Sequence, residues 1–115
     1  MDAREAAQRW ADTWERGWPE QDAEAIGALY AADAAWLQHP FREPESDYLA
    51  RVFAEEKSAE CAFETPIVDG DRAAVPWRGQ TKLVDGNRED LVGVSLLRFD
   101  GAGLVVEQRD IWVGR

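Results

Sequence analysis

His39 is the one histidine of this chain and the side chain best suited to move protons near neutral pH. It stands in the stretch AAWLQHPFREP, between an apolar run and Pro40. An imidazole with an ordinary pKa of about 6.5 can act as a catalytic base or as a ligand. It can equally be a polar residue that ends a strand, because the following proline cannot donate to a strand ladder. The residues alone leave both interpretations open.

Asp110 is the carboxylate that would complete such chemistry. The stretch VVEQRDIWV alternates in polarity, so Asp110 and Trp112 share one face of a predicted strand. If that face points inward, Asp110 could orient His39, and the pair could abstract a proton next to a carbonyl or activate a water. The alternative is an ion pair with an arginine at the rim of the fold: Arg78, Arg98 or Arg109.

Arg42 and Cys61 are two further side chains with possible chemistry. Arg42 in the stretch FREP could bind a carboxylate, although a solvated pair with Glu43 is the simpler interpretation. Cys61 is the only thiol, and no basic residue lies beside it in sequence, so we expect a buried structural residue. One cysteine and one histidine supply neither a disulfide nor a structural zinc site, and we expect no metal and no cofactor.

The composition excludes several classes of protein. The chain has 115 residues, which predicts one domain over residues 1–115. Its formal net charge of -10 disfavours nucleic-acid binding, because phosphate backbones would be repelled. No run is long and apolar enough to span a membrane, and the N-terminus lacks the apolar core of a signal peptide. We therefore expect a cytoplasmic protein with no membrane partner.

Helical patterns fill most of the first half. Apolar residues recur at helical spacing through residues 3–18, and Gly17 with the Trp18-Pro19 pair should end that helix. A second helix should follow Asp22 as its N-cap and bury a stripe that reaches Tyr30. A short strand is expected at 34–38 and a third helix at 44–57. The inward residues of the third helix should be Tyr48, Leu49, Val52 and Phe53.

The second half has the pattern of an antiparallel meander. Asp-Gly turns at residues 69, 85 and 100 supply the positive φ that tight hairpins need. They separate four predicted strands, at 59–68, 72–84, 88–99 and 104–113. Helices followed by antiparallel strands predict an α+β fold.

The sheet should have both faces covered. The run DLVGVSLLRF is apolar on both parities, whereas a strand with one solvated face should alternate. The helices can cover one face. A second subunit is the simplest cover for Val92, Val94 and Leu96 on the other face, so we predict a homodimer through the sheet.

Six tryptophans in so short a chain predict an aromatic core or an aromatic cavity. By strand parity Val75, Trp77 and Gly79 share a face, and Gly79 would leave space beside an indole for a flat hydrophobic ligand.

The order of these elements resembles the nuclear transport factor 2-like superfamily, in particular its SnoaL-like (polyketide cyclase-like, ketosteroid isomerase-like) branch. DAEAIGALYAADAAW is similar to the family's second helix and first strand, HPF with REPESDYLARVFAEE to its loop and third helix, and LLRFDGAGLVVEQRDIW to its last hairpin. The resemblance implies a cone-shaped curved sheet around about three N-terminal helices, with an apolar pocket that faces Gln108, Asp110 and Trp112. The fold does not fix the chemistry.

The resemblance also implies a place for His39. Steroid isomerases of this superfamily carry their proton-abstracting aspartate just before a Pro-Phe pair, where this chain has HPF. The positions matching their oxyanion-stabilising tyrosine and second acid hold Trp14 and Ser95, which do not reproduce that oxyanion hole. We therefore reject steroid isomerase as the specific activity.

These observations yield one hypothesis with two alternatives. We expect the chain to bind a small hydrophobic molecule, with acid–base catalysis (isomerisation, cyclisation, dehydration or hydrolysis) by His39 as base and Asp110 as its partner. The alternatives are a non-catalytic ligand-binding domain and a dimerisation scaffold of the same fold. The expected ligand-binding residues are Trp14, Trp36, Phe41, Phe53, Phe63, Trp77, Ser95 and Trp112.

Overall fold

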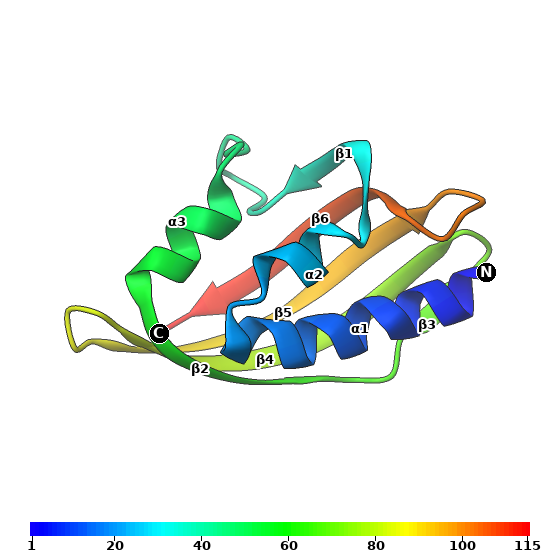
Figure 1. The fold of residues 1–115 in the computed structure, drawn as a ribbon. Coiled ribbons are helices and arrows are strands. Elements are labelled where there is room, and N and C mark those ends of the chain that lie inside the picture. The colour runs from blue at the N-terminus through cyan, green and yellow to red at the C-terminus, as the bar shows by residue number, and fades with distance from the viewer.

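Three helices cover the concave face of a curved, open six-stranded sheet in the computed structural model, which describes all 115 residues (Figure 1). The helices are α1 (Ala3–Glu20), α2 (Ala23–Gly27) and α3 (Tyr48–Glu55). The strands are β1 (Tyr30–Leu37), β2 (Glu56–Phe63), β3 (Ile67–Asp69), β4 (Arg72–Leu83), β5 (Arg88–Phe99) and β6 (Val105–Gly114). The predicted α+β class is confirmed.

Helix α1 buries the face that the helical spacing predicts, with Trp10, Trp14 and Trp18 directed at the sheet. The helix continues past Gly17 and Pro19 to Glu20, which corrects the predicted end. Pro19 lies in the last turn, where it has no N–H for the carbonyl oxygen of Glu15. That oxygen lies 3.5 Å from the Cys61 Sγ of β2 instead, so a neighbouring strand satisfies the group that the proline leaves free.

Helix α2 is shorter than predicted and ends at Gly27, because the chain turns into the sheet at once. The carbonyl oxygen of Leu29 accepts from the backbone N–H of Val105, and Tyr30 is already paired with that residue in β6. Strand β1 therefore begins four residues before its predicted start.

Helix α3 is also shorter than the predicted span of 44–57. Gln38 forms hydrogen bonds to the backbone N–H and carbonyl of Glu45, at 3.1 and 3.2 Å, which hold that residue in the loop. At the other end Glu56 pairs with Leu83, so β2 follows the helix without a turn.

The strands run in the order β1-β6-β5-β4-β2, and β3 pairs with the free end of β4. Both long hairpins, β4–β5 and β5–β6, have the predicted antiparallel register. The predicted strand 59–68 is split into β2 and β3 around Pro66, which cannot donate to a ladder. Strand β1 pairs with β6 in parallel, because α3 carries the chain away before the meander begins.

The two faces of the sheet differ in cover. The concave face packs on α1 through fully buried residues such as Val75, Leu97 and Val105. The outer face leaves Val92, Ile111 and other apolar side chains more than half exposed. None of the three helices combines the length and the apolar composition that crossing a bilayer requires. The expected cytoplasmic location stays a prediction.

Candidate functional site

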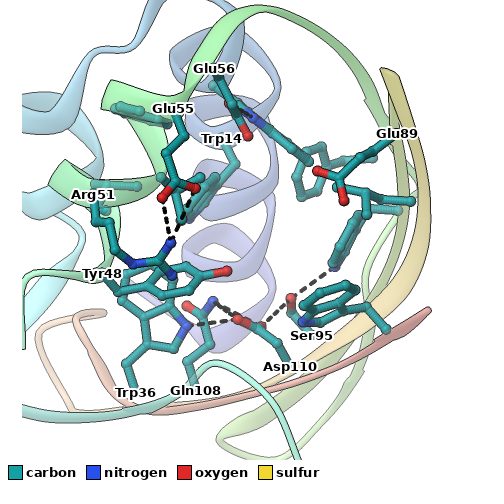
Figure 2. A pocket seen from close by; sticks show the side chains of 18 of the residues that line it. Trp14, Trp36, Tyr48, Arg51, Glu55, Glu56, Glu89, Ser95, Gln108 and Asp110 are labelled. Atoms are coloured by element: carbon teal, nitrogen blue, oxygen red, sulfur yellow. Dashed lines mark hydrogen bonds and ion pairs between the residues drawn. The ribbon is translucent and has the colours of Figure 1, made fainter. Parts of the chain in front are cut away.

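A cavity of about 240 Å³ lies between α1, α3 and the concave face of the sheet (Figure 2). Nine of its 21 lining residues are aromatic, in agreement with the aromatic cavity that was one of the two predictions from the tryptophan content. Eight of the predicted site residues line it: Trp14, Trp36, Phe53, Phe63, Trp77, Ser95, Asp110 and Trp112. His39 and Phe41 do not line it.

Asp110 on β6 is the polar centre of the cavity wall. Strand parity turns it to the concave face, where it is 8% exposed. Its Oδ2 accepts from Trp36 Nε1 at 2.7 Å, its Oδ1 accepts from Ser95 Oγ at 2.7 Å, and both oxygens lie within 3.2 Å of the Gln108 side-chain nitrogen. Figure 2 shows this carboxylate between Ser95 and Gln108 at the cavity wall.

No cation offsets the charge of Asp110. The alternative of an ion pair at the rim is wrong, because Arg109 pairs with Glu107 and none of the ion pairs includes Asp110. Burial raises the pKa of this carboxyl, and the hydrogen bonds from Trp36, Ser95 and Gln108 oppose the rise. A carboxyl that is kept from water without a counter-charge is suited to exchange a proton with a ligand.

A second layer of hydrogen bonds fixes Gln108 behind Asp110. The Gln108 side-chain oxygen accepts from Trp10 Nε1 at 3.2 Å and from the Tyr30 hydroxyl. The same hydroxyl oxygen accepts from the indole nitrogens of Trp10 and Trp14. The amide orientation is thus determined from both ends, and its nitrogen faces Asp110.

Every indole N–H of the chain has an acceptor. The partners of Trp10, Trp14 and Trp36 are given above. Trp77 donates to Ser95 Oγ at 3.0 Å, Trp18 to Glu56 Oε1 at 2.9 Å and Trp112 to the Gln38 carbonyl at 2.8 Å. Five of the rings also contact one another in a closed circuit, Trp10–Trp14–Trp18–Trp77–Phe63 and back to Trp10, with centroids 5.6–6.5 Å apart. The N–H groups and the rings therefore fix the walls together.

Glu56 and Glu89 are cavity residues that the sequence analysis missed. From the sequence, Glu56 beside Glu55 is most simply interpreted as a solvated charge. In the structure it begins β2 and is 8% exposed. Burial raises its pKa, the hydrogen bond from Trp18 lowers it, and the negative charges of Glu89 and Glu55 add to the rise. The position of Glu56 depends on its pairing with Leu83, for which the local sequence gives no signal.

Helix α3 supplies the remaining polar groups. Its inward residues Tyr48, Leu49, Val52 and Phe53 line the cavity as predicted. Burial raises the pKa of Tyr48 to about 12, and the charge of Asp110 adds to the rise, so the phenol stays protonated. Figure 2 shows its hydroxyl directed into the cavity with no hydrogen bond to the protein.

The two arginines of the cavity are already engaged. Arg51 lies 2.7 Å from each oxygen of Glu45 and also binds Glu55. Arg42 lies over the Trp112 ring, 5.5 Å from its centroid. Arg42 lines the cavity, and the expected pair with Glu43 does not form.

The expected pairing of His39 with Asp110 requires correction. The His39 ring packs edge-on against Trp112, with centroids 5.2 Å apart, and its Nδ1 accepts from the Phe41 backbone N–H. The three side chains that bond to Asp110 are Trp36, Ser95 and Gln108. His39 follows the end of β1 and is half-buried, but it does not line the cavity. Phe41 extends from the same turn and is 93% exposed.

Gly79 does not provide the expected space for a ligand. A Cβ atom at this position would lie 2.6 Å from the Trp18 ring. The missing side chain therefore makes room for Trp18, which packs directly on the backbone of β4. Cys61 of the neighbouring β2 is half-buried rather than buried as expected, and burial raises the pKa of its thiol to about 12, which disfavours the reactive thiolate.

Comparisons with known proteins agree with this fold. The family model of the SnoaL-like domain matches residues 7–108. An NTF2-like protein of unknown function from Exiguobacterium sp. 255-15 superimposes with a TM-score of 0.78 at 15% identity, covering 94% of this chain and 98% of its own. No curated protein matches the sequence.

Two other solved structures show how varied such proteins are. An LEH-like epoxide hydrolase from M. tuberculosis has a TM-score of 0.73 at 14% identity, over 96% of this chain and 82% of its own. A protein with a ketosteroid isomerase-like fold from Catenulispora acidiphila DSM 44928, in complex with trimethylamine, has a TM-score of 0.70 at 20% identity. The match covers 86% of this chain and 81% of that protein. At these identities the likeness shows the fold alone.

Proposed function

Because the chain belongs to the family of SnoaL-like domains, whose fold is shared by proteins of different activities, we propose a function from its own cavity. The cavity binds a small, largely hydrophobic molecule, and Asp110 performs acid–base chemistry on it. The observation that carries this proposal is a buried carboxyl without an ion pair on the wall of an aromatic cavity.

The longest hydrogen bond of Asp110 is the one that a substrate can replace. A carboxylate offers about four acceptor positions, and Trp36, Ser95 and the Gln108 nitrogen, which lies near both oxygens, contact this one four times. A proton next to a carbonyl, or one of a water molecule, can displace the 3.2 Å contact of Gln108 with Oδ2 and pass to that oxygen. The same carboxyl then returns it to a different atom of the intermediate, so the enzyme is regenerated.

Tyr48 supports the charge that develops in this reaction. As the proton leaves, negative charge builds on the substrate oxygen, which needs a donor. The Tyr48 hydroxyl faces the cavity, is unused by the protein and remains protonated. Asp110 thereby takes the role of base that the sequence assigned to His39.

A second candidate is ligand binding without turnover. The side chains that bond to Asp110, namely Trp36, Ser95 and Gln108, have no group that titrates near neutral pH, so none is a second general acid or base. On this alternative the carboxylate only orients the ligand.

Exchange of substrate protons with solvent separates these candidates. We expect the protein to catalyse deuterium incorporation next to the carbonyl of at least one member of a panel of cyclic and linear ketones, measured by proton NMR. Asp110→Asn should slow this exchange about 100-fold or more, the usual contribution of a general base. His39→Ala is the matched control and should retain the rate within about twofold. Binding without exchange would favour the second candidate, and loss of exchange only in His39→Ala would restore His39 as the base.

We further propose that the outer face of the sheet pairs with a second copy of the chain. Val92 of β5 lies opposite Val113, and Val94 lies opposite Ile111, which form one apolar patch on that face. Its rim carries both signs of charge, since Arg98 lies opposite Glu107. A patch of this kind can meet its own copy across a two-fold axis, with apolar centre on apolar centre and opposite charges at the rim.

A further inference from the structure

We propose that the ligand carries a positively charged amine, which the cavity holds between its aromatic rings and the carboxylates of Glu56, Glu89 and Asp110. The inference rests on the proposed function, because it takes the cavity to be a ligand site. It adds the chemical class of the ligand, an organic ammonium ion with apolar substituents.

The aromatic walls contain ring planes in more than one orientation. Trp14 meets Trp18 at an interplanar angle of 90° and Trp36 at 80°, and Trp18 meets Trp77 at 79°. All four indoles line the cavity. A ring face attracts an ammonium ion through its quadrupole, and an indole does so best.

The carboxylates of the cavity lack positive partners. Glu56, Glu89 and Asp110 come from three different strands, and none of them forms an ion pair. Figure 2 shows all three around the same central space. Glu56 and Asp110 are buried and Glu89 is half-buried. Buried charges are ordinarily paired, so the unpaired Glu56 and Asp110, with Glu89 beside them, leave a place for a cation.

The cavity's own arginines do not fill this place. Arg51 and Arg42 both line the cavity. The charge of Arg51 is offset by Glu45 and Glu55, and Arg42 is exposed and lies over the Trp112 ring. Neither arginine pairs with Glu56, Glu89 or Asp110, so these carboxylates remain available to an amine ligand.

The titration of the carboxylates agrees with this assignment. Burial raises the pKa of both Asp110 and Glu56 in the empty cavity, which means that their negative charge lacks solvation there. A bound ammonium ion would stabilise both charges and lower both pKa values. As the pH decreases and these carboxylates become protonated, the affinity for a cation should therefore fall. The affinity for a neutral ligand should not fall.

Isothermal titration calorimetry with a matched pair of probes tests the proposal. The probes are 3-hydroxyphenyltrimethylammonium and its neutral isostere 3-tert-butylphenol, which have nearly the same shape and differ in charge. We expect the cation to bind at least about tenfold more tightly than the phenol. Glu89→Gln should reduce that preference several-fold; it leaves no hydrogen-bond partner unsatisfied, so the variant should fold.

The control variant is Glu64→Gln, which removes the same charge from an exposed residue outside the cavity and should leave the preference unchanged. Equal or tighter binding of the phenol would overturn the amine assignment and leave the proposed function standing. Binding of neither probe would contradict both. A preference that Glu64→Gln reduces as much as Glu89→Gln would show attraction to the net charge of the chain, and would also overturn the assignment.

Discussion

Strands β5 and β6 depart from ordinary burial on both of their faces. On the concave face, the polar side chains of Ser95, Gln108 and Asp110 are buried beside apolar ones. On the outer face of the same strands, Val92, Ile111 and Val113 are 59%, 52% and 73% exposed. Buried polar groups and exposed apolar patches are the informative departures from ordinary burial. The two departures support the two proposals made above, a ligand on the inner face and a second copy on the outer face.

The largest expected effect comes from the inner face. Asp110→Ala removes the acceptor of three buried donors, from Trp36, Ser95 and Gln108, and each unsatisfied donor costs about 1–3 kcal/mol. We expect a loss of about 3 kcal/mol or more in the free energy of unfolding, measured by urea denaturation. The neighbouring Ile111→Ala on the outer face should cost less than about 1 kcal/mol when measured below the dimerisation concentration. Similar losses of unfolding free energy for Asp110→Ala and Ile111→Ala would contradict the difference between the inner and outer faces.

The outer face should control assembly. Val94→Asp places a carboxylate at the centre of the apolar patch, opposite Ile111 and Pro76. Desolvation of this charge and repulsion across the two-fold axis should weaken the dimer about 100-fold or more. Sedimentation equilibrium measures this change, with Asp110→Asn on the inner face as the control that keeps the dimer. An unchanged mass for Val94→Asp, or a wild-type protein that is monomeric at high concentration, would contradict the proposed interface.

The smallest effect is a dependence of stability on pH that arises from the inner face. The pKa of Asp110 is raised in the folded protein, so the folded state binds this proton more tightly than the unfolded chain does. The resulting stabilisation is fully present below the unfolded pKa of about 3.9 and is lost as pH rises through the folded pKa. Glu56 should contribute in the same direction.

Urea denaturation between pH 4 and pH 8 measures this dependence. We expect Asp110→Asn to remove part of the decline in stability, by about 1.4 kcal/mol for each unit by which the pKa is raised. Asp71→Asn, at an exposed residue, is the control and should leave the curve unchanged. Parallel curves for wild type and Asp110→Asn would show that Asp110 has the same pKa in the folded and unfolded states.

The sequence predicts those parts of the fold that local patterns determine. The buried face of α1 follows from the spacing of Trp10, Trp14 and Trp18, and the hairpins follow from Asp-Gly turns. The length of α3 does not follow, because side-chain hydrogen bonds from Gln38, which lies before the predicted helix, hold Glu45 in the loop. The parallel pairing of β1 with β6 has no local signal either.

The same distinction applies to the site. Strand parity groups Asp110 with Trp112 and Ser95 with Leu97, and the family resemblance implies which face points inward; Asp110 and Ser95 are both buried there. His39 lies outside the regular strand, where alternation gives no direction. Glu56 was missed because the junction of α3 and β2 is determined by pairing with β4. Adjacent acidic residues such as Glu55 and Glu56 ordinarily indicate solvent-exposed positions.

The closed circuit of five rings has a consequence for the affinity of the cavity. Each ring contacts two others of the circuit, and the nitrogens of its four indoles are fixed by hydrogen bonds. Binding often requires side chains to lose rotamer freedom, which weakens affinity. Here folding has already restricted these rings, so a ligand of the proposed kind would find a preorganised wall and would lose less of its binding free energy to ordering these side chains.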